Sequence, residues 1–171
     1  MGLGYRYTKY ILLTILALAT FILTLSIQEF GIYFGVLLLI GAALSAVYLF
    51  IHFDENINEK IILELAIDGF AGLIVFTYPE PDARFFMLDF SFWIAIMGML
   101  HLAAGLFEHR NSKYFWLFVL SGIMMIVFGF IILNYNTDYI GSVVYLIAIV
   151  LIYYALLNLY LTYKIKSLSI D

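Results

Sequence analysis

The sequence has no cysteine, only two prolines, and few charges over its 171 residues. Without cysteine, disulfide frameworks, thiolate chemistry and sulfur-ligated metals are excluded. Charged residues make up 12% of the chain, about half the share that a soluble domain carries. The alternation of apolar and polar residues that a membrane β-barrel requires is also missing. These absences leave an apolar protein whose folding cannot depend on covalent cross-links.

Hydrophobic residues make up 65% of the chain, and they gather in six long runs. The runs cover about residues 10–27, 30–51, 61–78, 85–107, 114–133 and 139–163. Each is near or above the roughly 20 residues that a helix needs to cross hydrocarbon. In lipid, backbone groups must be satisfied within the segment, so each run is expected to be helical. The sequence predicts an all-α polytopic protein with six transmembrane helices and a single membrane domain over residues 1–171.

Basic residues gather at one end of these expected spans. That end holds Arg6, Lys9, Lys60, Arg110, Lys113, Lys164 and Lys166, whereas the opposite loops hold only Arg84. Positive residues favour the cytoplasmic side of short loops. We therefore expect a multi-pass protein of the cell membrane with cytoplasmic N- and C-termini. The first run is too long for a cleavable signal sequence, so we expect it to be retained.

The six runs group into three tandem hairpins, at about residues 8–52, 61–109 and 113–163. In the first two hairpins a glycine precedes a histidine by eleven residues, as Gly41 precedes His52 and Gly98 precedes His109. A fixed offset of this kind predicts internal duplication. Chance alignment of apolar helices is the alternative.

Small residues recur along the runs at helical spacing. In lipid, close backbone approach at small residues supplies much of the association between helices. We expect helix packing at Gly35, Gly41, Gly72, Gly98, Gly105, Gly122 and Gly129. Aromatic residues near span ends are instead expected to be headgroup-level anchors: Tyr5, Tyr7, Tyr10, Tyr78, Tyr114, Trp116, Tyr135 and Tyr139.

Four ionisable residues lie inside the expected spans, where such groups are costly and often functional. Glu64 and Asp68 are spaced i, i+4 on one helix face. Asp89 and His101 belong to the next span, and His101 lies at nearly the depth of Glu64. One interpretation is structural: Glu64 pairs with Lys60, and Asp68 with His101. The other is that Glu64, Asp68 and His101 handle protons or ions.

Known catalytic and cofactor signatures are missing. There is no nucleotide loop, nucleophile elbow or zinc-protease motif. His52 and His109 fall at the cytoplasmic edge, and His101 has no histidine partner at its depth, so neither haem nor another metal is expected. We expect no enzymatic activity, no cofactor and no nucleic-acid partner. The expected surroundings are the lipid bilayer and either a homo-oligomer or a larger membrane complex.

Three tandem hairpins with glycine-centred runs, such as residues 34–41 and 121–129, resemble the HdeD-like family of short-repeat membrane proteins. The resemblance implies a non-enzymatic membrane protein associated with envelope or acid-stress tolerance. This chain departs from the family in its acidic third run and in the prolines Pro79 and Pro81. Two alternatives stay open: an accessory subunit of a larger membrane complex, and a proton or ion conduit through Glu64, Asp68 and His101.

Overall fold

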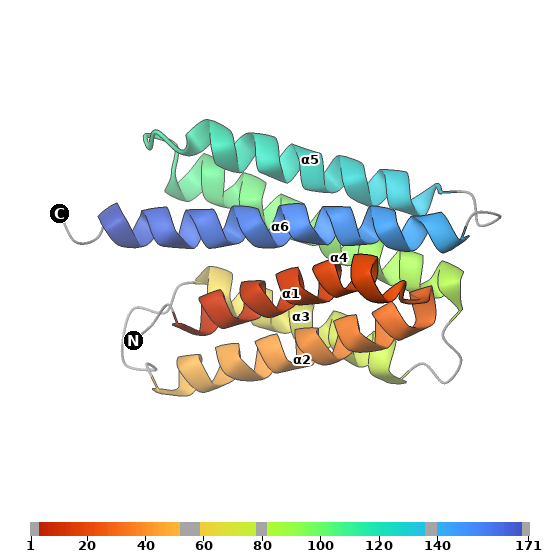
Figure 1. The fold of residues 1–171 in the computed structure, drawn as a ribbon. Coiled ribbons are helices and arrows are strands. Elements are labelled where there is room, and N and C mark those ends of the chain that lie inside the picture. Colours follow the sequence, from red (N-terminus) through yellow and green to blue (C-terminus); the bar gives the residue numbers. More distant parts are fainter. Residues whose placement is uncertain (1–3, 52–58, 78–81, 136–139, 169–171) are drawn as a thin grey trace.

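The computed structural model describes residues 4–51, 59–77, 82–135 and 140–168. Within these ranges the chain forms six α-helices and one turn of π-helix, and no strand (Figure 1). The elements are α1 (Gly4–Leu23), α2 (Ile27–Ile51), α3 (Glu59–Thr77), α4 (Ala83–Ala103), η1 (Ala104–Glu108), α5 (Phe115–Leu133) and α6 (Ile140–Leu168). The predicted all-α class is confirmed for this part of the chain.

The turn between α1 and α2 lies earlier than the apolar run predicted. Thr24 adopts a left-handed backbone with φ of 48° and ends α1. Ser26 then opens α2 with a capping box: the Glu29 carboxylate accepts from the Ser26 amide at 2.9 Å, and Ser26 Oγ accepts from the Glu29 amide at 3.2 Å. The first run therefore ends at Leu23, and Ile27 belongs to α2.

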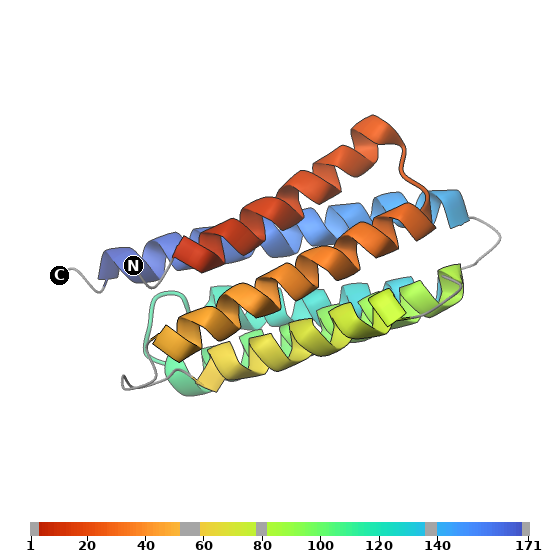
Figure 2. The same cartoon turned by 90° about the horizontal axis from the view of Figure 1, so that it is seen from below.

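The helices lie side by side along one common direction, and the start of α1 and the end of α6 lie at the same end of the bundle (Figures 1 and 2). The most extensive packing joins α4 to α5, α2 to α3, and α1 to α6. The pairs expected as hairpins, α1 with α2, α3 with α4 and α5 with α6, pack less extensively. The expected hairpin arrangement is thus not confirmed, and the internal duplication stays a prediction.

Glycine determines which helices approach most closely. A Cβ atom on Gly98 of α4 would lie 2.7 Å from the carbonyl oxygen of Gly122 on α5, and the reverse distance is also 2.7 Å. On Gly129 it would lie 2.8 Å from the carbonyl oxygen of Ser91, and on Gly105 3.0 Å from Phe118 Cβ. The α4–α5 contact therefore requires residues without a side chain.

The α2–α3 contact depends on the same property. A Cβ on Gly72 would lie 3.0 Å from the carbonyl oxygen of Gly35, and one on Gly35 would lie 2.9 Å from Val75 Cγ1. Gly41 differs, because its nearest neighbour is the side chain of Lys9 on α1. All seven glycines expected to pack helices thus lie against a neighbouring helix.

Four stretches among the described helices are long and apolar enough to cross a membrane: Ile27–Ile51, Ala83–Glu108, Phe115–Leu133 and Gly141–Lys164. The apolar part of α1, Tyr7–Leu23, is shorter, and α3 does not qualify. The expectation of six spans is therefore not confirmed by length and composition. Four charged residues, Glu59, Lys60, Glu64 and Asp68, lie within the 19 residues of α3.

Candidate functional site: polar clusters inside the helix bundle

Among the charged side chains that the structure describes, Asp68 is the most enclosed, with no exposed surface. Its Oδ2 atom accepts from the ammonium of Lys9 on α1, and the two groups form a salt bridge. Its Oδ1 atom accepts from the indole Nε1 of Trp93 on α4 at 3.0 Å. One carboxylate on α3 therefore ties together three helices.

Lys9 reaches Asp68 because of where it lies on α1. It shares an inward stripe with Leu13, Leu16 and Thr20, and its own side chain is 3% exposed. Its alkyl stem passes over Gly41 of α2, where a Cβ would lie 3.3 Å from Lys9 Cδ. Lys9 therefore does not belong to the charged edge where the sequence had placed it, because its ammonium has a buried carboxylate partner.

Glu64 lies one turn before Asp68 on the same face of α3 and is 6% exposed. It interacts electrostatically with both Lys9 and Asp68. The ammonium of Lys9 thus has two carboxyl groups near it. The pairing expected between Glu64 and Lys60 falls outside the described residues, because the Lys60 side chain is not among them.

A chain of aromatic rings encloses the Asp68 cluster. Phe34 of α2 contacts Trp93 with ring centroids 5.1 Å apart, and Trp93 contacts Tyr154 of α6 at 4.9 Å. Tyr154 in turn meets Tyr10 of α1 edge-on at 5.8 Å. Tyr10 is 2% exposed, so it is a core residue and not the interfacial anchor that was expected. These rings exclude water from the ion pair, and low polarity strengthens its attraction.

His101 belongs to a second, separate cluster. Its Nδ1 lies 3.2 Å from Ser121 Oγ on α5, and its Nε2 lies 3.1 Å from Asn158 Oδ1 on α6. The amide nitrogen of Asn158 donates to the Tyr154 carbonyl at 2.9 Å, which turns the amide oxygen toward His101. His101 Nε2 therefore carries a hydrogen and donates it to Asn158.

The structure does not bring Asp68 and His101 together. Trp93, the Asp68 partner on α4, precedes His101 by eight residues, which is about 12 Å along a helix. The sequence suggested this pair because it treated α3 and α4 as one closely packed hairpin. The two residues instead bind different partners, Asp68 those on α1 and near the middle of α4, and His101 those on α5 and α6.

Asp89 stands apart from both clusters. It lines a groove between α3 and α4, and no hydrogen-bond partner in the described part of the chain reaches its enclosed Oδ2 atom. The expected group of Glu64, Asp68, His101 and Asp89 is therefore divided over three places. Among the described residues, no three histidine, aspartate or glutamate side chains are grouped to hold a metal ion.

Sequence reasoning missed Lys9, Trp93, Ser121 and Asn158 as partners of the buried groups. A signal existed for Lys9, because the spacing of Lys9, Leu13, Leu16 and Thr20 marks one helix face. Asn158 could also have been noticed as an amide inside an apolar run. No comparable signal marks Trp93, since an indole in a membrane helix is usually read as an interfacial residue.

The described arrangement suits cohesion between helices. Lys9, Asp68 and Trp93 join α1, α3 and α4, while His101, Ser121 and Asn158 join α4, α5 and α6. Helix α4 takes part in both clusters. It ends in the π-helical turn η1, where His109 donates its amide to the Ala104 carbonyl and stacks on Phe118 at 4.5 Å.

Comparison with known proteins gives one match. Residues 66–134, which cover most of α3 and all of α4 and α5, match the model of a family described as a short repeat of unknown function, DUF308. HdeD-like proteins belong to this family. No curated protein and no solved structure matches the chain. The segment with the close glycine contacts of α4 and α5 is thus similar to a repeat family, and it includes two of the four stretches that are long and apolar enough to cross a membrane, Ala83–Glu108 and Phe115–Leu133.

Proposed function

We propose that this chain is a non-enzymatic integral membrane protein of the HdeD-like type that contributes to envelope or acid-stress tolerance. The observation that carries the proposal is the match of residues 66–134 to the short-repeat family. The glycine-mediated contact of α4 with α5 lies within the matched segment. The resemblance of the wider sequence supports the HdeD-like type.

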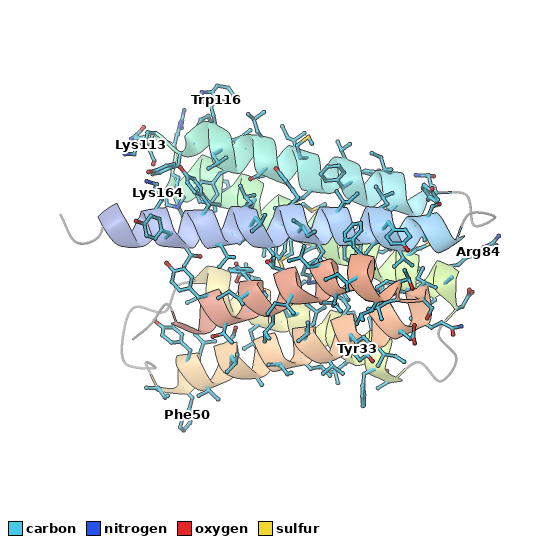
Figure 3. The ribbon with its side chains drawn as sticks, in the orientation of Figure 1. Tyr33, Phe50, Arg84, Lys113, Trp116 and Lys164 are labelled. Atoms are coloured by element: carbon cyan, nitrogen blue, oxygen red, sulfur yellow. The ribbon has the colours of Figure 1, made fainter. Side chains whose placement is uncertain are left out.

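In this proposal all six helices cross the bilayer, with both termini in the cytoplasm. The two α3 charges whose side chains the structure describes support a membrane position because both point inward: Glu64 is 6% exposed and Asp68 is fully buried. The opposite face of α3 carries Phe70 and Phe76, which are 69% and 64% exposed. An apolar outer face over a paired polar interior suits lipid contact. Lys113 and Lys164 lie at the end of the bundle that holds the termini, and Arg84 lies at the other (Figure 3).

We assign the two polar clusters a structural role. A proton conduit needs a carboxyl group that can exchange its proton, whereas both oxygens of Asp68 already accept from Lys9 and Trp93. The grouping of Lys9, Glu64 and Asp68 is nevertheless the one feature that favours a conduit as second candidate. Proton flux into proteoliposomes distinguishes the structural role from the conduit. For the native chain we expect no flux above that of empty vesicles. Flux through the native chain that is lost in Asp68→Asn would favour the conduit.

The stress function is tested by survival. Cells without the gene, cells that express the native chain and cells that express a poorly packed variant, Gly98→Ala, are exposed to acid at matched protein levels. We expect the native chain to raise survival above both other strains. Equal survival in all three would contradict the proposed function.

Purification from native membranes in mild detergent, followed by mass spectrometry, tests the remaining alternative: stoichiometric companion chains would indicate an accessory subunit.

A further inference from the structure

A groove between α3 and α4 has a volume of about 560 Å³. It exists because α3 and α4 pack less extensively than their glycine-mediated neighbours. Phe70 of α3 and Phe92 of α4 are 69% and 59% exposed on its walls, and Trp93 also lines it. Its size falls within the range of sites for small organic ligands.

Among the described residues that line this groove, Asp89 alone is charged. Its Oδ2 atom is enclosed and lacks a hydrogen-bond partner within the described ranges, and no salt bridge found there includes Asp89. A buried carboxyl oxygen without a donor is costly, so native proteins rarely leave one. A donor in the groove that reached the carboxyl group would offset that cost.

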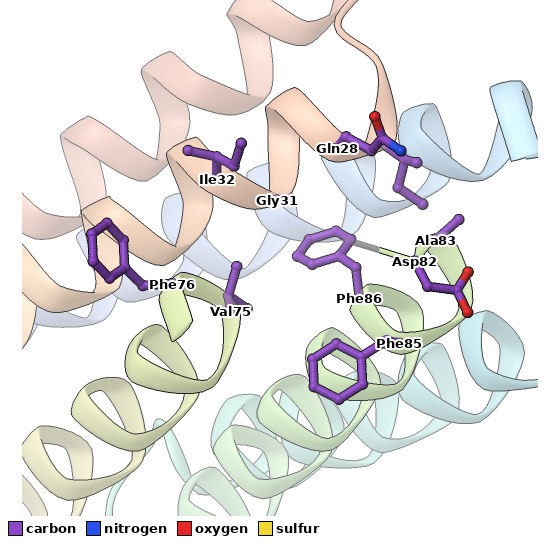
Figure 4. Close-up of a pocket in the computed structure, with 10 residues that line it drawn as sticks. Gln28, Gly31, Ile32, Val75, Phe76, Asp82, Ala83, Phe85 and Phe86 are labelled. Atoms are coloured by element: carbon purple, nitrogen blue, oxygen red, sulfur yellow. The ribbon is translucent and has the colours of Figure 1, made fainter. Parts of the chain in front are cut away.

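Two further hollows differ from this groove in their described lining. The one at the start of α4, about 260 Å³, includes Asp82, as Figure 4 shows. Asp82 is already engaged, because its side chain accepts from the Arg84 amide at 3.1 Å and caps α4. The hollow between α1 and α2, about 320 Å³, is lined by Tyr33 and apolar side chains and holds no charged residue. The Asp89 groove is thus distinguished by an unused acidic group.

We propose that this groove binds a single-chain amphiphile whose polar end is a protonated amine. The alkyl chain lies against Phe70 and Phe92, and the ammonium donates to the carboxylate of Asp89. Charge complementarity selects the amine, because a charge-assisted hydrogen bond is strongest away from water. Asp89 lies six residues after Ala83, or about 9 Å along the helix, a depth that a single-chain amine can reach from the bilayer interface.

The native chain allows a fluorescence test. It contains two tryptophans, Trp93 in the groove and Trp116 with 67% exposure. In a Trp116→Phe background the emission comes from Trp93 alone. A chain-brominated dodecylamine, the matching alcohol and the matching carboxylate are added to the protein in phosphatidylcholine vesicles. We expect saturable quenching by the amine at about tenfold lower concentration than by the alcohol, the effect of one charge-assisted hydrogen bond.

Two variants and a control assign the effect to the groove. In Asp89→Asn, the amine should quench Trp93 only at the concentration that the alcohol needs. Glu108→Gln removes an exposed charge from the far end of the same helical segment and should leave the quenching by the amine unchanged. Ala66→Phe places a ring in the groove and should remove saturable quenching by both compounds. Equal quenching by amine and alcohol in the native chain would overturn the proposal, even if Asp89→Asn failed to fold. Linear, non-saturable quenching by all three would overturn it too, since only bulk lipid would then reach Trp93.

Discussion

Lys9 and Asp68 form an ion pair that is closed off from the surroundings of the bundle, with side chains 3% and 0% exposed. Burial removes the water that would otherwise stabilise each charge, so each group depends on the other. Removal of one partner leaves an uncompensated charge inside the protein. Lys9→Met and Asp68→Leu should each lower the free energy of unfolding by about 3–5 kcal/mol, measured by unfolding in one mild detergent.

The double variant Lys9→Met/Asp68→Leu is the sharper measurement, because it removes both charges together. Its loss should be well below the sum of the two single losses, since an apolar pair often replaces a buried ion pair at little cost. Lys113→Met is the matched control, because that lysine is exposed. Additive losses in the double variant would show that the two charges do not depend on each other.

Asn158 and Asn134 offer a second comparison at the residue scale. Each donates its amide nitrogen to the carbonyl four residues earlier, at 2.9 Å and 2.8 Å respectively. Only Asn158 also accepts a hydrogen bond from His101. Asn158→Leu should therefore lower the free energy of unfolding by about 1–2 kcal/mol, whereas Asn134→Leu should stay within about 0.5 kcal/mol of the native value. Equal losses would mean that the His101 bond adds no stability.

At the scale of the helices, glycine decides which pairs approach most closely. A methyl group on Gly98 would meet the Gly122 carbonyl oxygen at 2.7 Å, and backbone cannot rotate out of the way. A methyl group on Gly69 would meet only Ala42 Cβ, at an ordinary 3.7 Å. Gly98→Ala should therefore lower the unfolding free energy by about 1–3 kcal/mol through overpacking.

Gly69→Ala is the matched control for that substitution. Both exchanges bring the same gain in helix propensity, about 1 kcal/mol. Gly69→Ala should therefore leave the unfolding temperature unchanged or raise it. If both variants shifted it downward by the same amount, the close contact between α4 and α5 would not be the cause.

Over the whole molecule, the sequence predicted the helices better than their partners. A long apolar run identifies a helix because lipid tolerates few other backbone structures, and five of the six runs begin and end within a few residues of the observed helices. The first run differs because the Ser26–Glu29 capping box overrides hydropathy at its end. Partners are harder, since nearly uniform apolar faces contain little information about what covers them.

The buried polar groups show the same limit. Their presence in the spans could be predicted from the sequence, because ionisable and polar residues are energetically costly, and therefore rare, within an apolar run. The most distant of their partners could not be predicted, since Lys9 precedes Asp68 by 59 residues and Asn158 follows His101 by 57. The sequence grouped α3 with α4 as one hairpin, whereas the close glycine contacts join α2 to α3 and α4 to α5.

The orientation of the whole bundle in the membrane is testable because the chain contains no cysteine. A single cysteine can then report one position without any background. Arg84→Cys and Lys113→Cys mark opposite ends of the bundle, and both positions are exposed (Figure 3). If the termini are cytoplasmic, a membrane-impermeant maleimide should label Cys at position 84 in intact cells and Cys at position 113 only after permeabilisation. The reverse pattern would overturn the proposed orientation. It would also mean that the lysines and arginines near the termini do not set the topology. Lys9 is not one of those residues, because its ammonium pairs with the buried carboxylate of Asp68.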